Sequence, residues 1–185
     1  MQCIELVIQD HVILRRGLDI LEGMIKELEV GERIEIADVT SILKFFRVFG
    51  YQYHQTTEEK SLFPPLLRDT SPESSLHLMW SEHGEVQAMT AAVEDALRSK
   101  RAGDFMRNSS RLTHFFRTHL DQEDVILRDI AERSLSKEDD SSIAAEFMKN
   151  HQAPEIFADF SRLERKYTQK VPRTPLSSER PLAHA

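Results

Sequence analysis

The chain has 185 residues, and 24 lysines and arginines against 31 aspartates and glutamates give it a formal net charge of −7. This acidic balance, with no basic block, argues against electrostatic binding to nucleic acid or to an anionic membrane surface. A single cysteine, Cys3, excludes an internal disulfide framework and a thiolate-rich metal site. Because there is neither a run of about 20 apolar residues nor a secretory signal at the N-terminus, we expect a single-domain, soluble cytoplasmic protein.

Apolar residues recur at steps of three and four along four successive segments, which is the pattern of amphipathic helices. Breaks are expected at Gly31, at Pro64 with Pro65, and at Gly103. The predicted helices cover about residues 2–29, 37–68, 72–100 and 104–133. Because the connections are too short to join parallel neighbours, the predicted fold class is all-α, an antiparallel up-down-up-down four-helix bundle.

A weaker helical pattern follows the four main segments. It predicts one additional C-terminal helix over about residues 140–168, with Pro154 kinking or interrupting its start. Residues 171–185 are rich in proline and serine and poor in apolar residues, so we expect a disordered tail. The predicted organisation is thus one helical domain over residues 1–170, with no second domain.

Each of the four main helices carries a histidine within its apolar face. Two of these histidines are followed four residues later by a glutamate, which an α-helix places on the same face one turn away. At about 1.5 Å per residue, the four histidines fall at the same level of the bundle to within roughly one turn, ~5 Å. The candidate metal ligands are His11, His54, Glu58, His83, His119 and Glu123.

Electrostatics favours a metal between these side chains. Two buried carboxylates without partners would each cost several kcal/mol or become protonated, and a cation between them removes both problems. A nitrogen and oxygen donor set without thiolate suits iron or manganese and also zinc. Tyr51 is a further candidate as an outer donor to the site, although a plain core aromatic is the simpler interpretation. The remaining histidines are predicted to lie at the surface or in packing positions: His77, His114, His151 and His184.

Several short motifs carry a resemblance to a known family. They are DHVILRR from Asp10, HQTTEEKSLFP from His54, Glu82-His83, and HLDQEDVIL from His119. Over about residues 1–133 the chain resembles the hemerythrin-like, or HHE cation-binding, family. The resemblance implies a non-haem centre of two iron ions of the Fe–O–Fe type. It also implies that His11, His54, His83 and His119 are terminal ligands and that Glu58 and Glu123 are bridges.

The chain departs from the oxygen-carrying members of that family at two positions. Gln87 stands where those members have a second histidine on the third helix. Asp124 has the spacing of their fourth-helix carboxylate, so it competes with Glu123 for the bridging role, and we prefer Glu123 because it follows the apolar face. The missing histidine favours ligand sensing, peroxide or nitric oxide chemistry, or iron handling over simple oxygen carriage.

We therefore expect a protein that binds, senses or handles oxygen, nitric oxide, peroxide or iron. Two alternatives stay open at this point. One is an enzyme of the peroxidase or oxidase type at the same centre, and the other is a structural bundle holding zinc, or no metal, that acts as an interaction module. A small diatomic ligand or peroxide is the expected partner, with a homodimer as a further expectation.

Overall fold

We describe residues 1–68, 74–150 and 154–168 of the protein from a computed structural model. Every regular element in these ranges is a helix, in agreement with the predicted all-α class. None of these helices combines the length and the apolar character needed to cross a membrane. The segment predicted as a disordered tail, residues 171–185, lies outside the described residues.

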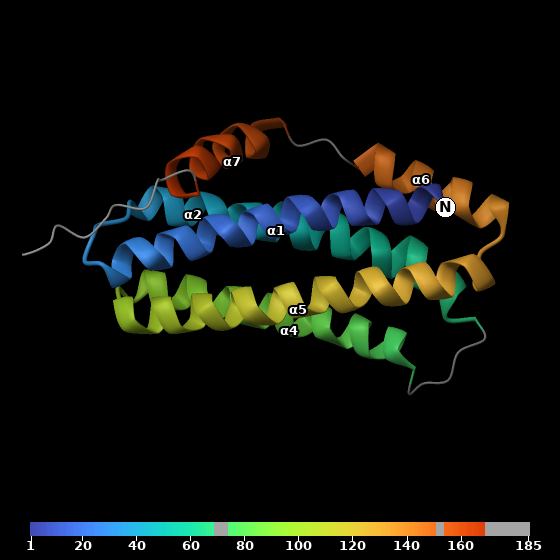
Figure 1. Ribbon diagram of the computed structural model, residues 1–185, viewed down its shortest axis with the longest axis horizontal. Coiled ribbons are helices and arrows are strands. Elements are labelled where there is room, and N and C mark those ends of the chain that lie inside the picture. Colours follow the sequence, from blue (N-terminus) through green and yellow to red (C-terminus); the bar gives the residue numbers. More distant parts are fainter. Residues whose placement is uncertain (69–73, 151–153, 169–185) are drawn as a thin grey trace, which may run out of the picture.

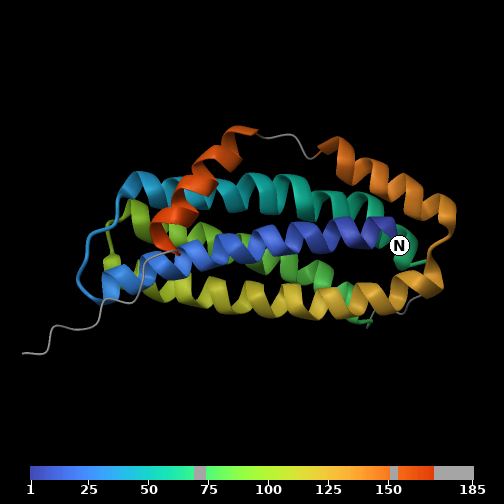
Figure 2. The ribbon, with the colours of Figure 1, turned by 45° about the horizontal axis from the view of Figure 1, so that its top comes forward.

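Four long helical segments lie side by side along the molecule (Figures 1 and 2). The chain reverses its direction at each connection between them, as the colours in Figure 1 show. The first, third and fourth segments are α1 (Gln2–Glu29), α4 (Ser75–Arg98) and α5 (Ala102–Ser134). The second segment consists of α2 (Ile36–Phe45), η1 (Phe46–Gln55), η2 (Glu58–Leu62) and α3 (Phe63–Leu66).

The second segment is predicted as a single α-helix over 37–68, but η1 and η2 are π-helical. A π-helix is wound more widely than an α-helix and is frequently found at functional sites. His54 lies in η1 and Glu58 begins η2. The wider winding therefore occurs where this segment presents its two candidate ligands.

The apolar faces of the segments pack into two hydrophobic clusters. One cluster includes Leu14, Phe45 and Phe116, and the other includes Val7, Phe63 and Leu127. On α1, the second segment and α4 the candidate ligands lie between residues of the two clusters. On α5, His119 lies beside Leu120 at the edge of the first cluster, and Glu123 lies between Leu120 and Leu127 of the second. A polar layer therefore divides the apolar interior of the protein.

The C-terminal part forms two helices, where the sequence predicted one over 140–168. They are α6 (Lys137–Asn150) and α7 (Pro154–Tyr167). A proline has no backbone N–H to continue a helix but fits well in a first turn, which explains why a new helix begins at Pro154. In Figure 1, α6 and α7 lie on the same side of the four long segments, at opposite ends, and both contact α1.

Buried charge fixes α7 against the second segment. The Asp38 carboxylate is 1% exposed and accepts hydrogen bonds from Arg162 at 2.7 Å, Lys166 at 2.6 Å and Tyr167 at 2.7 Å. Burial opposes ionisation of Asp38, but these three donors outweigh it and lower its pKa to about 2. At the contact between α7 and α1, a Cβ atom on Gly23 would lie 2.3 Å from the Tyr167 carbonyl oxygen, so only glycine fits there.

Candidate metal centre

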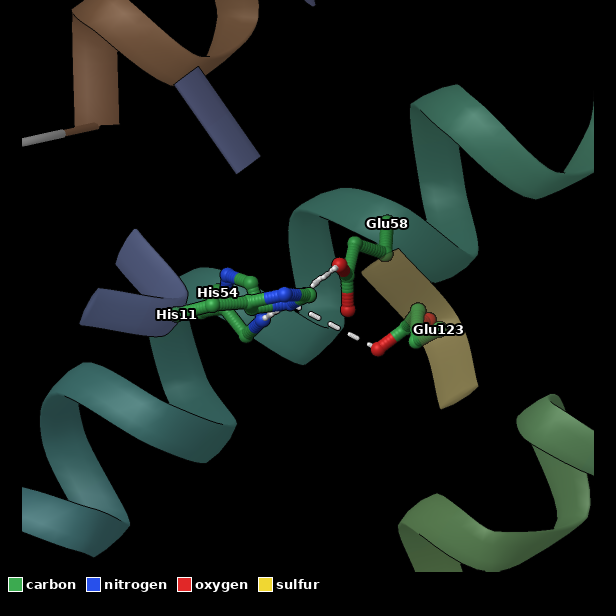
Figure 3. Close-up of side chains that lie close together, drawn as sticks. All are labelled: His11, His54, Glu58 and Glu123. Atoms are coloured by element: carbon green, nitrogen blue, oxygen red, sulfur yellow. Dashed lines mark hydrogen bonds and ion pairs between the residues drawn. The ribbon is translucent and has the colours of Figure 1, made fainter. Parts of the chain in front are cut away.

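The polar layer consists of the six side chains that the sequence analysis selected, and the structure brings them together from all four long segments. Each of these residues is at most 2% exposed. Figure 3 shows four of them converging on one point in the interior. By element, the set is His11 on α1, His54 on η1, Glu58 on η2, His83 on α4, and His119 and Glu123 on α5.

The two glutamates lie between the histidines. Glu58 Oε1 is 3.7 Å from His11 Nε2 and 3.3 Å from His54 Nε2, while its Oε2 is 3.6 Å from His83 Nε2. Glu123 Oε2 is 3.5 Å from His11 Nε2 and 3.2 Å from His119 Nε2, and its Oε1 is 4.0 Å from His83 Nε2. Each carboxylate therefore lies within 4.0 Å of three of the four imidazoles.

The carboxylate oxygens of this layer have unmet bonding capacity. Within the part of the chain that the structure describes, none of the four oxygens of Glu58 and Glu123 accepts a hydrogen bond. Leaving a buried acceptor without a partner costs about 1–3 kcal/mol, and more when it is charged. A cation between the carboxylates would provide the missing partner for all four oxygens.

A second set of carboxylates surrounds the layer and binds the outer nitrogens of the histidines. Asp124 Oδ1 lies 2.6 Å from His11 Nδ1, Glu59 Oε1 lies 2.8 Å from His83 Nδ1, and Glu82 Oε2 lies 2.8 Å from His119 Nδ1. The fourth histidine, His54, has its Nδ1 at 3.5 Å from Asp10 Oδ2. We call Asp10, Glu59, Glu82 and Asp124 the outer carboxylates.

The outer carboxylates determine which way the imidazoles present their lone pairs. An ionised carboxylate only accepts hydrogen bonds, so His11, His83 and His119 must donate their Nδ1–H outward. When these imidazoles are neutral, the Nε2 lone pairs then point into the layer. A histidine that donates its other ring nitrogen to a carboxylate is the common arrangement for a metal ligand, because it fixes the ring and its tautomer.

The outer carboxylates connect the four segments in a closed cycle. Each one directly precedes or follows an inner residue on its own segment and lies against a histidine on the next segment. Three of these contacts are hydrogen bonds, and the fourth is the 3.5 Å approach of Asp10 to His54. Asp10 of α1 approaches His54 of η1, and Glu59 of η2 binds His83 of α4. Glu82 of α4 binds His119 of α5, and Asp124 of α5 binds His11 of α1, which closes the cycle. The cycle holds the four rings at one level of the protein.

Burial and charge shift the pKa values of the inner groups in different directions. Burial, reinforced by the Glu123 charge, raises the pKa of Glu58 well above its ordinary range. Burial also opposes ionisation of Glu123, but the neighbouring imidazoles, His119 foremost, lower its pKa to about 2. Burial lowers the pKa values of His11 and His83 and thus favours their neutral, metal-binding form.

The structure also places the candidates that the sequence analysis left open. Asp124 bonds the outer nitrogen of His11, whereas Glu123 lies inside the layer. Gln87 donates to Gln55 Oε1 at 3.5 Å, beside the layer. Tyr51 is 41% exposed and lines a surface cavity.

The other histidines lie outside the layer. His114 is exposed, and His77 bonds Ser74 at its own helix start. His151 and His184 are outside the described residues.

Three of the outer carboxylates were not found from the sequence. Asp10, Glu59 and Glu82 do not follow the apolar faces, so the spacing argument passes over them. A usable signal was nevertheless present, because each of them is adjacent in sequence to a candidate ligand. An acidic residue that directly precedes or follows a candidate ligand in the sequence is therefore itself a candidate for orienting a histidine on the neighbouring helix.

The donor atoms form two overlapping groups that fit a metal. His11, His54, Glu58 and Glu123 offer ligand atoms within 4.8 Å of one another, as do His83, His119 and Glu123. Both groups combine imidazole nitrogen with carboxylate oxygen, a donor set that suits iron, manganese and zinc. Glu123 belongs to both groups.

Comparison with known proteins adds independent information. No curated protein and no solved structure matches the chain. The hemerythrin HHE cation binding domain matches residues 3–131, which include every residue of the polar layer and all but the outermost residues of the four long segments. The matched residues make up well over half of the chain and include the buried histidine and glutamate cluster, so the chain belongs to the hemerythrin HHE cation-binding domain family.

Proposed function

We propose that the chain is an antiparallel four-helix bundle that holds two iron ions in its polar layer and there binds, senses or handles oxygen, nitric oxide or peroxide. One observation supports the metal most directly, namely the four buried oxygens of Glu58 and Glu123 that accept no hydrogen bond in the described chain. The proposed terminal ligands are His11, His54, His83 and His119, because their Nε2 atoms face these oxygens. The two glutamates are the proposed bridges.

Two ions account for the arrangement better than one. The donor atoms fall into two groups that share Glu123, and the two oxygens of Glu58 face histidines of both groups. The layer and its surroundings also hold six carboxylates around four imidazoles, and the Arg15 guanidinium contacts one of them, Asp124, at 2.7 Å. Two multivalent cations would offset this local excess of negative charge.

Six protein side chains leave coordination positions open on two ions, and these positions are where a small ligand would bind. Iron in a mixed imidazole and carboxylate set supplies redox chemistry and affinity for diatomic ligands. Gln87 replaces the second third-helix histidine of the oxygen-carrying members, which leaves one more position open on the His83 and His119 side. The protein contributes fixed imidazoles, neutral at physiological pH for His11 and His83, and an apolar interior that limits access of water.

Metal content and the visible spectrum of the purified chain test the proposal. After loading with ferrous iron in air, we expect two irons per chain and visible absorption that changes when azide, nitric oxide or peroxide is added. The Glu58→Ala variant should lose the metal. Glu85→Ala, an exposed glutamate on α4, is the matched control and should retain it.

Three results would contradict parts of the proposal. Fewer than one iron per chain would refute the metal assignment, and retention of full occupancy in Glu58→Ala would refute Glu58 as a bridge. Selective retention of zinc over iron would instead support a structural metal. Sustained turnover of peroxide would turn the binding role into an enzymatic one.

A further inference from the structure

A surface pocket of about 430 Å³ lies between α2 and the end of α4, apart from the polar layer. Its wall comes from α2, from the beginning of η1, and from the last residues of α4 together with Lys100 just after it. In Figure 1 this is the end of the bundle remote from the N-terminus. Neither the inner residues nor the outer carboxylates line the pocket, so the metal proposal leaves it unexplained.

The pocket is strongly basic although the chain as a whole is acidic. One carboxylate, Glu94, faces four cations, which gives the lining a charge of +3 in a chain of net charge −7. Arg47 meets Glu94 at 3.6 Å, whereas the other three cations form no ion pair within the described ranges of the chain. The four cations are Lys44, Arg47, Arg98 and Lys100. Three positive charges are therefore available to a ligand.

The dipole of one helix does not explain this gathering of charge. Cations near the C-terminus of a helix are common because they offset its unpaired carbonyl groups, and this accounts for Arg98 and Lys100 at the end of α4. Lys44 and Arg47 belong to the second segment, where α2 continues directly into η1 and leaves no helix end. Two segments thus bring their cations to one pocket.

The backbone at Lys100 is a second, independent sign of a functional role. The turn after α4 is closed by two backbone hydrogen bonds, from Arg101 N–H to the Ala96 carbonyl at 3.0 Å and from Lys100 N–H to the Leu97 carbonyl at 3.0 Å. This turn usually has glycine in the position of Lys100, which has a φ of 55°, because a Cβ disfavours the left-handed conformation. Lysine is thus unfavourable for the local fold, and the side chain that it adds lines the pocket.

The floor of the pocket is apolar and limits the kind of ligand. Leu43 is buried, Leu97 is partly buried, and Ile36 is 62% exposed at the rim. A volume of about 430 Å³ falls within the usual range of roughly 300–1,000 Å³ for small-molecule sites. An extended polyanion would meet the negative charge of the rest of the chain, so the pocket favours a small anion with an apolar part.

We propose that this pocket, the basic pocket, binds a small organic phosphate with a compact apolar body. The basic side chains hold the phosphate group, since lysine and arginine are the usual partners of phosphate in proteins, and the body lies on Leu43 and Leu97. The inference goes beyond the proposed function, because it requires no metal in the polar layer. It assigns to the protein a second ligand of a different chemical class.

Three probes separate the contributions of the phosphate and of the apolar body. 2-Naphthyl phosphate carries both, inorganic phosphate lacks the body, and 2-naphthol lacks the charge. In isothermal titration calorimetry of the full chain as purified, we expect 2-naphthyl phosphate to bind with one site per chain. We expect each of the other two probes to bind at least about tenfold more weakly, because each lacks one of the two contributions. Raising NaCl from about 50 to 500 mM should weaken 2-naphthyl phosphate binding at least about fivefold, since salt screens exposed charges.

Variants test the individual charges of the basic pocket. Lys44→Gln and Lys100→Gly should each weaken 2-naphthyl phosphate binding about threefold, within the range that one exposed ion pair provides. Lys100→Gly should at the same time raise the midpoint of urea denaturation, because glycine suits the φ of 55°. Glu94→Gln should tighten binding about threefold, since it removes a repelling charge and releases Arg47. Arg111→Gln, an exposed arginine of α5 outside the pocket, makes the same change in net charge as Lys44→Gln and should have no effect.

The proposal is overturned if 2-naphthyl phosphate does not bind, if either of the other probes binds as tightly, or if Arg111→Gln weakens binding as much as Lys44→Gln. The Glu58→Ala variant keeps this test separate from the metal proposal, because it should lose the iron and still bind 2-naphthyl phosphate normally. Loss of probe binding in Glu58→Ala would place the probe at the metal and refute the basic pocket. Probe binding in an unmodified chain that holds no iron supports the basic pocket and refutes the metal proposal alone.

Discussion

Replacing Glu58 by glutamine should stabilise the metal-free protein while it destroys the metal site. In the metal-free state, an oxygen of Glu58 lies no more than 4.8 Å from an oxygen of Glu123, and both residues are fully buried. At an effective dielectric constant of about 20, two charges at this separation repel by about 3.5 kcal/mol. Protonating Glu58 at pH 7 to avoid the repulsion costs about 3.4 kcal/mol from its ordinary pKa of 4.5.

A buried Glu58 incurs either the charge repulsion or the cost of protonation. Glutamine incurs neither, because it carries no charge and needs no proton. Its amide still requires partners that the layer does not fully provide, which offsets about 1 kcal/mol of the gain. We therefore expect Glu58→Gln to raise the free energy of unfolding of the metal-free chain at pH 7 by about 2 kcal/mol. With iron present the order should reverse, because the unmodified chain gains binding energy that the variant cannot.

The gain should depend on pH in a defined direction. The pKa of Glu58 is raised in the folded protein, so its contribution to stability is fully present below pH 4.5 and is lost as the pH rises toward the folded pKa. The variant has no such loss. The stability difference should thus be small at pH 4.5 and grow toward pH 7.

Urea denaturation followed by circular dichroism, in the presence of a chelator and at both pH values, measures this difference, with Glu85→Gln as the control. A variant that is no more stable than the unmodified chain at pH 7, or a difference that does not change with pH, would show that the two carboxylates do not repel each other in the folded state.

Two further predictions concern the surroundings of the layer and the position of α7. Asp124→Ala should weaken iron binding about 10–100-fold, as the loss of a hydrogen-bonding partner of a metal-bound histidine typically does. Asp121→Ala, which removes a neighbouring contact to the same Arg15 at 2.8 Å, should leave it unchanged in competition titrations with a chelator. Gly23→Ala should destabilise the chain by about 1–3 kcal/mol in urea, since the new Cβ overlaps a carbonyl oxygen of α7. The control is Gly84→Ala, where the new Cβ has open space around it and should stabilise α4 by up to about 1 kcal/mol. Equal effects of Gly23→Ala and Gly84→Ala would contradict the close contact between Gly23 and the Tyr167 carbonyl oxygen.

The sequence predicted the polar layer because one simple rule governs it. A side chain on the apolar face of a long helix points to the interior, so a histidine such as His11 or His119 on that face is buried if the helix forms. The rule depends only on spacing, and it holds along α1 almost to its end. In α5 the buried face shifts beyond Glu123. Leu127 is buried there and Ile126, three residues after Glu123, is only partly buried, because 3.6 residues per turn drift from a seven-residue repeat.

Features that depend on contacts between segments could not be predicted in this way. The outer carboxylates lie off the apolar faces, so their spacing on one helix does not distinguish Glu82 from an ordinary exposed acid. The π-helical winding of η1 and η2 reflects which backbone bonds the tertiary packing favours, and it has no signature in the apolar pattern. The basic pocket depends on how α2 and the end of α4 lie against each other, which composition and spacing do not specify.

The polar layer divides the apolar interior into two clusters, and this division has a physical consequence for the whole protein. A bundle selected only for stability would place apolar residues at these levels, since buried ionisable groups without partners oppose folding. Local conflict of this kind is characteristic of functional sites, where the sequence departs from what the fold alone favours. The same carboxylates that oppose folding without a cation favour it with one, so metal occupancy and the stability of the fold are thermodynamically linked in the proposed centre. The outer carboxylates make the link effective, because they hold the imidazoles in place whether or not the interior charge is balanced.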